Sequence, residues 1–142
     1  MGEWDVASTM HFRREEHRSA DRTVFRWLPG GVWLEANSVM PNTPIGPMFG
    51  SARIAWDEQA KVYVRHWIDN QSTVVLTLRG RFTDDSTLEF AGSFEWIDGR
   101  VFHQRLAIYR LPDEGWREVG YMGLDPDNLQ PNHEGVATRA RF

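Results

Sequence analysis

The sequence contains no cysteine, and this absence removes several kinds of chemistry at once. Without thiols the chain can form no disulfide, offer no thiolate to a metal ion and use no cysteine nucleophile. The chain also lacks an excess of basic residues, since its formal net charge at pH 7 is -4. A basic surface is the electrostatic signature of proteins that bind phosphate backbones. We therefore expect no nucleic acid partner.

Long apolar runs are missing as well. No stretch approaches the roughly 20 apolar residues that a bilayer-spanning helix needs. The opening residues, MGEWDVASTM, show no charged region followed by an apolar core of the kind found in secretory signals. We expect a cytoplasmic protein with no membrane partner.

Amphipathic helical segments are equally scarce. The only candidate, RREEHRSADR at residues 13–22, has no apolar stripe to bury, so we expect a solvated loop there. What the sequence has instead is a series of turn signals, such as LPGGV, IDNQST and FTDDST, between short runs in which apolar and polar residues alternate. This rhythm is typical of an antiparallel β-sandwich or barrel.

The alternating runs predict an all-β fold, an antiparallel up-and-down β-barrel of about ten strands. No repeat or low-complexity linker interrupts the 142 residues, so we expect a single barrel domain over residues 1–142. The expected strands cover residues 3–12, 23–29, 32–40, 49–56, 61–68, 73–83, 87–97, 100–111, 116–124 and the closing segment 134–142.

The run KVYVRHWIDN places Arg65 directly before His66, and neighbouring side chains of a strand point to opposite faces. The apolar faces of the adjoining strands align only when Arg65 points inward and His66 outward. With DEQA and DNQS as the flanking loops, Arg65 is predicted to lie opposite Ala52 on one side and Leu76 on the other. The pattern thus predicts a charged side chain in the barrel interior.

The same alternation predicts on which face of the sheet two further groups of side chains lie. Arg26 is expected opposite Glu35 on the outer face, as a cross-strand ion pair. The facing of the strand at 100–111 depends on the turn before it. A two-residue turn at the dipeptide DG would aim His103 inward, whereas a bulged three-residue turn would aim Gln104 and its apolar neighbours inward. The bulged turn gives the better apolar pattern and is the one we predict.

Long connections gather at one end of the predicted barrel. They are residues 13–22, the segment MPNTPIGPM at 40–48 and the segment DPDNLQPNH at 125–133. Long loops without secondary structure are more often functional than accidental on a compact domain, so this end is the predicted mouth. The segment 40–48 is either a rigid connection or a lid, and the sequence leaves both readings open.

A resemblance to a known family rests on features spread over roughly the first ninety residues. They are GEWDV near the start, then Trp56-Asp57, Lys61, Tyr63, Trp67, Asp69, Gly80, Leu88 and Gly92. In these features the chain resembles the bacterial family called domain of unknown function 1579. The resemblance implies a calycin-type barrel, the group that includes lipocalins and fatty-acid-binding proteins. Because the shared features are structural, it implies a fold and no activity.

No strong catalytic motif stands in the sequence. It contains no G-x-S-x-G, no H-E-x-x-H, no phosphate-binding loop and no G-x-G-x-x-G after a strand. The five histidines are scattered without the spacing of metal ligands. We therefore predict no metal site and no cofactor.

Arg65 is the sharpest single feature. A buried guanidinium stays charged and has to be paired or hydrogen-bonded. In a structural role it would stack on Trp67 or Tyr63 and bond to carbonyls, to Ser8 or Ser38, or to a carboxylate that the sequence does not place. In a functional role its partner would be a carboxylate, an enolate or a polarised carbonyl of a ligand. The sequence supports both readings.

Two functions from different classes remain. The first is a module that binds a small hydrophobic or aromatic molecule, polyketide-like, with an acidic or carbonyl group. The second is a cofactor-independent enzyme of natural product biosynthesis, such as a cyclase, isomerase or dehydratase, in which Arg65 stabilises negative charge and Tyr63 or Tyr121 donates a proton. In both cases the expected partner is a small molecule. The sequence also leaves open whether the protein forms a homodimer. The predicted ligand-binding side chains are Trp4, Trp27, Ser38, Trp67, Phe94, Trp96 and Gln104.

Overall fold

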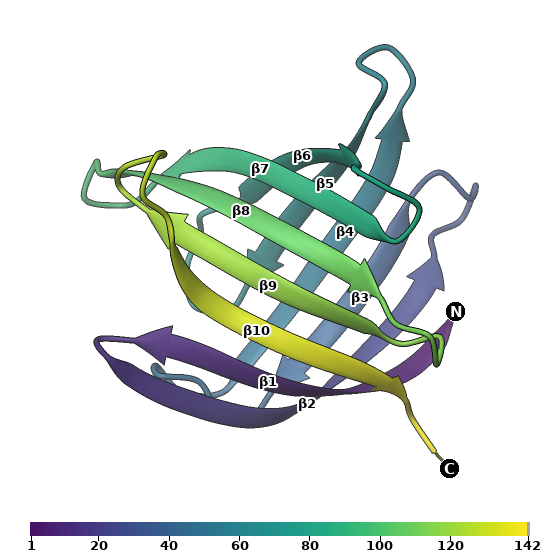
Figure 1. Cartoon of the computed structure of the whole chain (residues 1–142), viewed down its shortest axis with the longest axis horizontal. Coiled ribbons are helices and arrows are strands. Elements are labelled where there is room, and N and C mark those ends of the chain that lie inside the picture. Colours follow the sequence, from purple (N-terminus) through teal and green to yellow (C-terminus); the bar gives the residue numbers. More distant parts are fainter. Residues whose placement is uncertain (142) are drawn as a thin grey trace.

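The computed structural model describes residues 1–141 and shows one closed, antiparallel β-barrel (Figure 1). Each strand pairs with its neighbour in sequence, and β1 closes the ring by pairing with β10. The strands are β1 (Gly2–Phe12), β2 (Glu15–Trp27), β3 (Leu34–Met40), β4 (Met48–Asp57), β5 (Val62–Asp69), β6 (Leu76–Phe82), β7 (Thr87–Glu95), β8 (Val101–Arg110), β9 (Trp116–Gly123) and β10 (Gln130–Arg139). The predicted all-β, up-and-down barrel of about ten strands is confirmed. No helix within residues 1–141 is long and apolar enough to cross a membrane.

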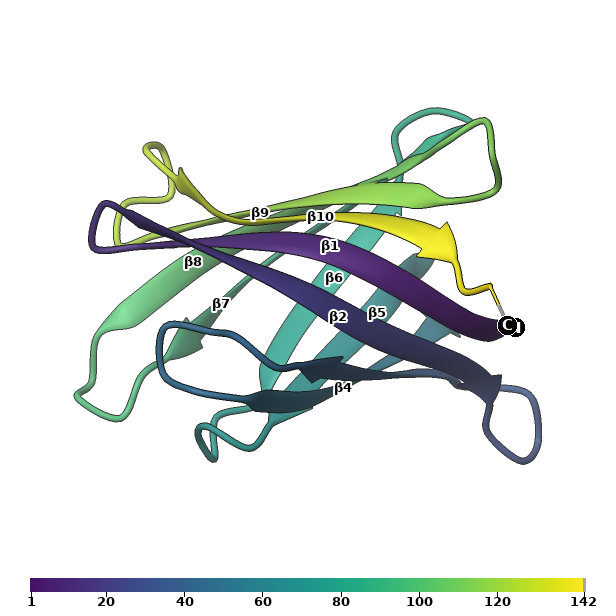
Figure 2. The ribbon, with the colours of Figure 1, turned by 90° about the horizontal axis from the view of Figure 1, so that it is seen from below.

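The connections divide between the two ends of the barrel. The start of β1 and the end of β10 lie together at one end, which also carries the β2–β3 and β8–β9 turns (Figure 2). The β1–β2 and β9–β10 turns lie at the opposite end, together with the β3–β4 loop (Figure 2).

The prediction of a solvated loop at residues 13–22 is wrong. Only Arg13 and Arg14 form the turn, and their φ angles of 50° and 67° lie in the left-handed region that two-residue hairpins use. The residues after them form the first half of β2, and every residue of that half pairs with a residue of β1. An apolar stripe could not reveal this strand, because the side chain that it buries there is the polar Asp21.

Other strand limits also differ from the predictions. β10 begins at Gln130, so the last residues of the predicted loop 125–133 are strand, and a register shift between Pro131 and His133 marks a bulge. β6 begins at Leu76, three residues later than expected. Two of the three long loops at the predicted mouth are therefore shorter than the sequence suggested.

The facing of β5 is as predicted, although its register is not. Arg65 lies opposite Ile54 on β4 and Leu78 on β6, each two residues away from the predicted partners Ala52 and Leu76. A slip of two residues keeps every side chain on its face, since strand side chains alternate with a period of two. His66 correspondingly lies on the outer face, where its Nδ1 is 2.9 Å from the hydroxyl oxygen of Thr77.

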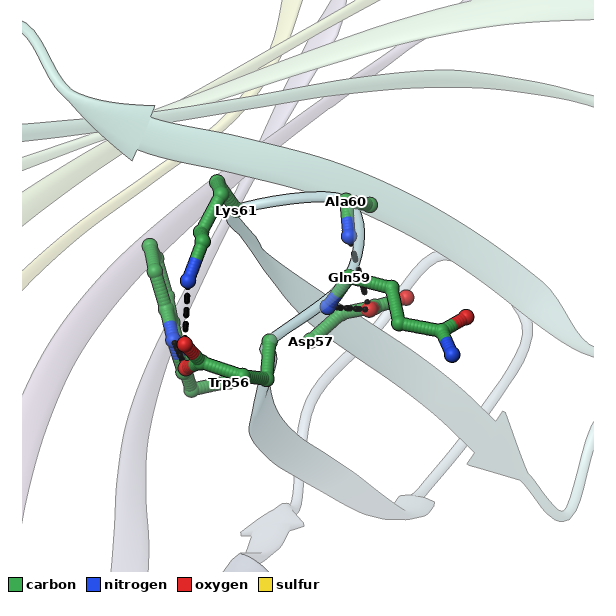
Figure 3. A network of polar contacts seen from close by, with 6 residues as sticks. Trp56, Asp57, Gln59, Ala60 and Lys61 are labelled. Atoms are coloured by element: carbon green, nitrogen blue, oxygen red, sulfur yellow. Dashed lines mark hydrogen bonds and ion pairs between the residues drawn. The ribbon is translucent and has the colours of Figure 1, made fainter.

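The turn between β4 and β5 explains the slip against β4 (Figure 3). The Asp57 carboxylate accepts hydrogen bonds from the backbone N–H groups of Gln59 and Ala60, both at 3.0 Å. The backbone N–H of Lys61 donates to the carbonyl of Asp57 at 2.8 Å, and Lys61 has a φ of 55°. The loop therefore comprises residues 58–61 and not 57–60, and Asp57 becomes a paired strand residue.

The predicted facing of β8 is confirmed. Trp96 and Arg100 are joined by a backbone hydrogen bond of 2.8 Å, which leaves three residues in the turn, and Gly99 has the positive φ of 84° that such a turn needs. Gln104 and Leu106 consequently point into the barrel.

Two apolar clusters pack inside the barrel. Leu78, Phe90 and Leu106, from β6, β7 and β8, form one of them. Trp4, Val6 and Ala137, from β1 and β10, form the other, where the sheet closes on itself. Neither cluster fills the space between them.

On the outer face, Glu35 ties three strands together. Its carboxylate accepts hydrogen bonds from Arg26 at 2.7 Å and Asn37 at 2.9 Å, and Arg53 lies 3.3 Å away. The predicted Arg26–Glu35 pair is thus confirmed, and the side chain of Glu35 is only 4% exposed. The hydrogen bond from Asn37, followed by that from Arg26, holds the pKa of Glu35 below its usual value.

Replacing Glu35 with glutamine should make the stability less sensitive to acid. The variant loses charge-assisted bonds and should be less stable at neutral pH by about 1–3 kcal/mol. The folded pKa of Glu35 lies below its ordinary value of 4.5. The carboxylate therefore contributes its full stabilisation above that pH, and the contribution is lost as pH falls through the lowered pKa. The stability difference between the two proteins, from urea unfolding, should therefore shrink from neutral pH to about pH 3. A difference that stays constant over this range would contradict the assignment.

Candidate functional site

The barrel encloses a cavity of about 570 Å³. Its lining is largely apolar, and side chains from near both ends of the barrel contribute to it. All five methionines of the chain line it: Met1, Met10, Met40, Met48 and Met122. Methionine side chains are flexible and polarisable, so they can adapt an apolar wall to ligands of different shape. Which end opens to solvent stays a prediction.

Arg65 projects from β5 into this cavity. Its guanidinium carbon lies 5.4 Å from the centre of the Trp67 ring, a cation–π contact. Among the described residues, no side chain or carbonyl forms a hydrogen bond or an ion pair with Arg65. Burial lowers the pKa of Arg65, and the Glu118 carboxylate raises it. The guanidinium therefore keeps its donors free to meet something in the cavity.

Trp67 forms the wall beside Arg65 and is held by two contacts. Its ring lies against Gly50 on β4, so closely that a Cβ on that glycine would be 2.1 Å from the ring. Its indole N–H donates to the Asp69 carboxylate at 2.8 Å, and the other oxygen of Asp69 accepts from the backbone N–H of Gln71 at 2.9 Å. The indole is thus fixed at one side by packing and at the other by a hydrogen bond.

Glu118 on β9 and His133 on β10 lie on another part of the cavity wall. His133 Nδ1 is 3.7 Å from a Glu118 carboxylate oxygen, and the two side chains are only 19% and 25% exposed. Gly135 lies beside this pair, and a Cβ there would touch Cγ of Glu118 at 3.4 Å. Neither residue was among the predicted site residues.

A second polar group sits where β1 meets β2. The Ser8 hydroxyl donates to the Asp21 carboxylate at 2.5 Å, and both residues are buried. Beside them, the hydroxyls of Thr23 and Ser38 are 2.8 Å apart. Asp21, Thr23 and Ser38 all line the cavity. The cavity therefore carries polar groups at several places on an otherwise apolar wall, as small-molecule sites do.

The signals for the missed residues were present in the sequence but needed the correct strand limits. Once Gln104 faces inward, antiparallel pairing with β9 puts the even-numbered residues of that strand, including Glu118, on the inner face. His133 was hidden because β10 was expected to begin only at Glu134, and Asp21 because its strand was taken for a loop.

The structure places five of the predicted site residues in the cavity wall. Besides Arg65, they are Trp4, Ser38, Trp67 and Gln104. They come from β1, β3, β5 and β8, so strand alternation alone brought them together.

The remaining predicted site residues lie elsewhere. Tyr63 points inward but packs edge-on against Trp56 and Phe82, away from the cavity lining. Tyr121 faces outward, because it pairs with Arg105, whose guanidinium lies 4.6 Å from its ring centre. Neither tyrosine is placed to donate a proton in the cavity.

Three predicted aromatic residues likewise do not line the cavity. Trp27, at the last position of β2, is 55% exposed, since the strand ends there. Phe94 stacks on Phe102 at 5.6 Å and contacts Trp96 edge-on at 6.4 Å. This small aromatic group lies around the β7–β8 turn, so its rings pack on one another instead of forming the cavity wall.

Metal binding was not predicted, and no group of three or more histidine, aspartate or glutamate side chains with metal-binding geometry occurs in the part of the chain that the structure describes. The absence of a cofactor remains a prediction.

Substitution of Gly50 by alanine tests the packing of Trp67. The added methyl group would overlap the indole ring, which its bond to Asp69 holds in place. Overpacking of this kind should destabilise the fold by about 1–3 kcal/mol and shift the indole N–H resonance of Trp67. Ser51→Ala, at the next position on the opposite face, is the matched control. Unchanged stability and an unchanged resonance would show that Gly50 does not determine the position of the Trp67 ring in the cavity wall.

Comparison with known proteins adds a family. Residues 1–129 match the family described as protein of unknown function, DUF1579. No curated protein matches the chain. The crystal structure of Rv2717c from M. tuberculosis is similar, with a TM-score of 0.65 and 13% sequence identity over 99% of this chain and 92% of that chain. At that identity the likeness shows a shared fold alone. Since the family match extends over nearly all of the barrel, this chain belongs to the DUF1579 family of proteins of unknown function.

Proposed function

We propose that this protein binds a small organic molecule inside the barrel, with an apolar or aromatic body and a carbonyl or acidic group. The observation that carries the proposal is the guanidinium of Arg65, which lies over Trp67 in the cavity and forms no hydrogen bond or ion pair with any described residue. A charged group in such a place needs an oxygen partner. The cavity has room for a ligand that supplies such an oxygen beside the water it can hold.

The size and lining of the cavity support the same proposal. Its volume of about 570 Å³ lies within the range of about 300–1,000 Å³ that is typical of small-molecule sites. Five methionines and the rings of Trp4, Phe25 and Trp116 supply apolar contact area. An aromatic, polyketide-like compound with a carbonyl or acid function combines the two features, and we propose this ligand class.

The chemistry of arginine explains why an oxygen is the group expected at Arg65. The guanidinium presents five N–H donors in a planar fork and accepts no hydrogen bond. A carboxylate or carbonyl oxygen can take two of these donors at once, while the ring of Trp67 backs the apolar face of the fork. The bound molecule would thus lie with its oxygen at β5 and its apolar body against the methionines.

Binding of 2-naphthoic acid, an aromatic carboxylate, to the protein and to Arg65→Met tests the proposal. Methionine keeps much of the stem volume and removes the charge, so affinity should fall by about 2–5 kcal/mol. The variant should remain as stable as the natural protein or gain stability, because it strands no hydrogen-bond or ion-pair partner of Arg65 and loses only the longer-range attraction of Glu118. Isothermal titration and thermal denaturation measure the two effects.

Arg79→Met provides the matched control, because Arg79 is exposed on β6 and faces outward beside Ala91. It should change neither affinity nor melting temperature appreciably. If Arg65→Met instead lowers the melting temperature and leaves affinity unchanged, Arg65 has a structural role and the proposed site loses its anchor.

A further inference from the structure

Two charged side chains face each other across the cavity without touching. In the ring of strands, β5 with Arg65 and β9 with Glu118 are separated by three strands on one side and by five on the other. Both side chains line the cavity, and no ion pair within 4.0 Å joins them. Burial lowers the pKa of Arg65, and the Glu118 carboxylate partly offsets this effect, as expected of opposite charges that share one cavity.

The surroundings of Glu118 suit a base. On β8 its cross-strand neighbour is Ile108, and on β10 it is Gly135, so little polar structure surrounds the carboxylate. The one ion-pair contact of Glu118 among the described residues is with His133, at 3.7 Å, a distance that lies outside hydrogen-bonding range. The carboxylate therefore has lone pairs that no described side chain occupies, and they face a largely apolar cavity.

We propose that the cavity catalyses proton transfer at a carbon next to a carbonyl group, with Glu118 as the base and Arg65 as the group that stabilises the enolate. This inference rests on the proposed function, since it needs a carbonyl ligand at Arg65. It assigns the site an isomerase-like reaction that needs no cofactor.

The step balances without any other reactant. The C–H bond next to the carbonyl breaks, and its proton passes to a carboxylate oxygen of Glu118. The electron pair of that bond forms a carbon–carbon double bond, and the carbonyl π electrons move to the oxygen, where the charge of Arg65 stabilises them. When the proton held by Glu118 is replaced by a solvent deuteron before it returns to the same carbon, the result is hydrogen exchange. Return of the proton to another carbon of the conjugated system gives an isomer.

The geometry favours Glu118 over the tyrosines that the sequence suggested. Tyr121 faces outward beneath Arg105, and Tyr63 is packed against other aromatic rings outside the cavity lining. Glu118 is the titratable group whose charge acts on Arg65 across the cavity. A carbonyl compound bound at Arg65 would present its neighbouring carbon to that opposite wall.

Hydrogen exchange into 2-tetralone, an aromatic ketone with activated C–H bonds, tests the inference. The ketone is incubated with the protein in D₂O, and proton nuclear magnetic resonance follows the loss of the C1 protons. A positioned general base should accelerate exchange by about 100-fold or more over buffer. Glu118→Gln should lower the rate to that of buffer while 2-tetralone still binds. Arg65→Met should slow exchange even at concentrations of ketone that saturate the variant.

Two further variants keep the result interpretable. Glu134→Gln makes the same change on the outer face, where Glu134 pairs with Arg117, and should leave exchange unaltered. Glu118→Asp serves if Glu118→Gln proves unstable. It keeps a carboxylate but draws it back from the cavity, and should retain part of the acceleration. Circular dichroism of each variant confirms that the barrel is intact.

The outcomes separate this inference from the binding proposal. If 2-tetralone binds and exchanges only at the buffer rate, or if Glu118→Gln exchanges as fast as the natural protein, proton transfer by Glu118 is refuted and binding stands. If neither 2-tetralone nor 2-naphthoic acid binds, the proposed function fails, and the inference fails with it.

Discussion

Closure of the sheet by pairing of β1 with β10 is the constraint on which the rest of the molecule depends (Figure 1). A closed sheet has no free edge, and strand alternation sends every second side chain into one shared interior. With ten strands, the apolar clusters around Phe90 and Trp4 do not fill that interior, and a cavity of about 570 Å³ remains. Polar side chains that alternation turns inward must then find their partners inside it.

The sequence was sufficient for the architecture and for the facing of most strands, because facing depends only on parity. Arg65 points inward even though its register is shifted by two residues, since such a shift leaves parity unchanged. The exact register depended on the connections on both sides of β5. In the turn before β5, Lys61 adopts a positive φ that composition does not reveal. After β5, the next strand begins at Leu76, three residues later than expected.

The site was predicted only in part, and the reason is the same in each case. A search for buried apolar faces finds Trp4 and Trp67 but overlooks carboxylates that strands turn inward, such as Asp21 on β2 and Glu118 on β9. Aromatic residues near strand ends are instead predicted to bind the ligand when they do not. Trp27 and Trp96 are examples, because they lie outside the cavity wall. A functional interior departs from the apolar pattern where its polar groups lie.

The central claim is that the cavity holds a small molecule, and native mass spectrometry tests it most directly. The protein, purified without denaturation and incubated with metabolites extracted from cells, should carry an added mass of one small molecule that is released on unfolding. A natural protein that stays at the mass of its own chain both as purified and after that incubation would contradict the account.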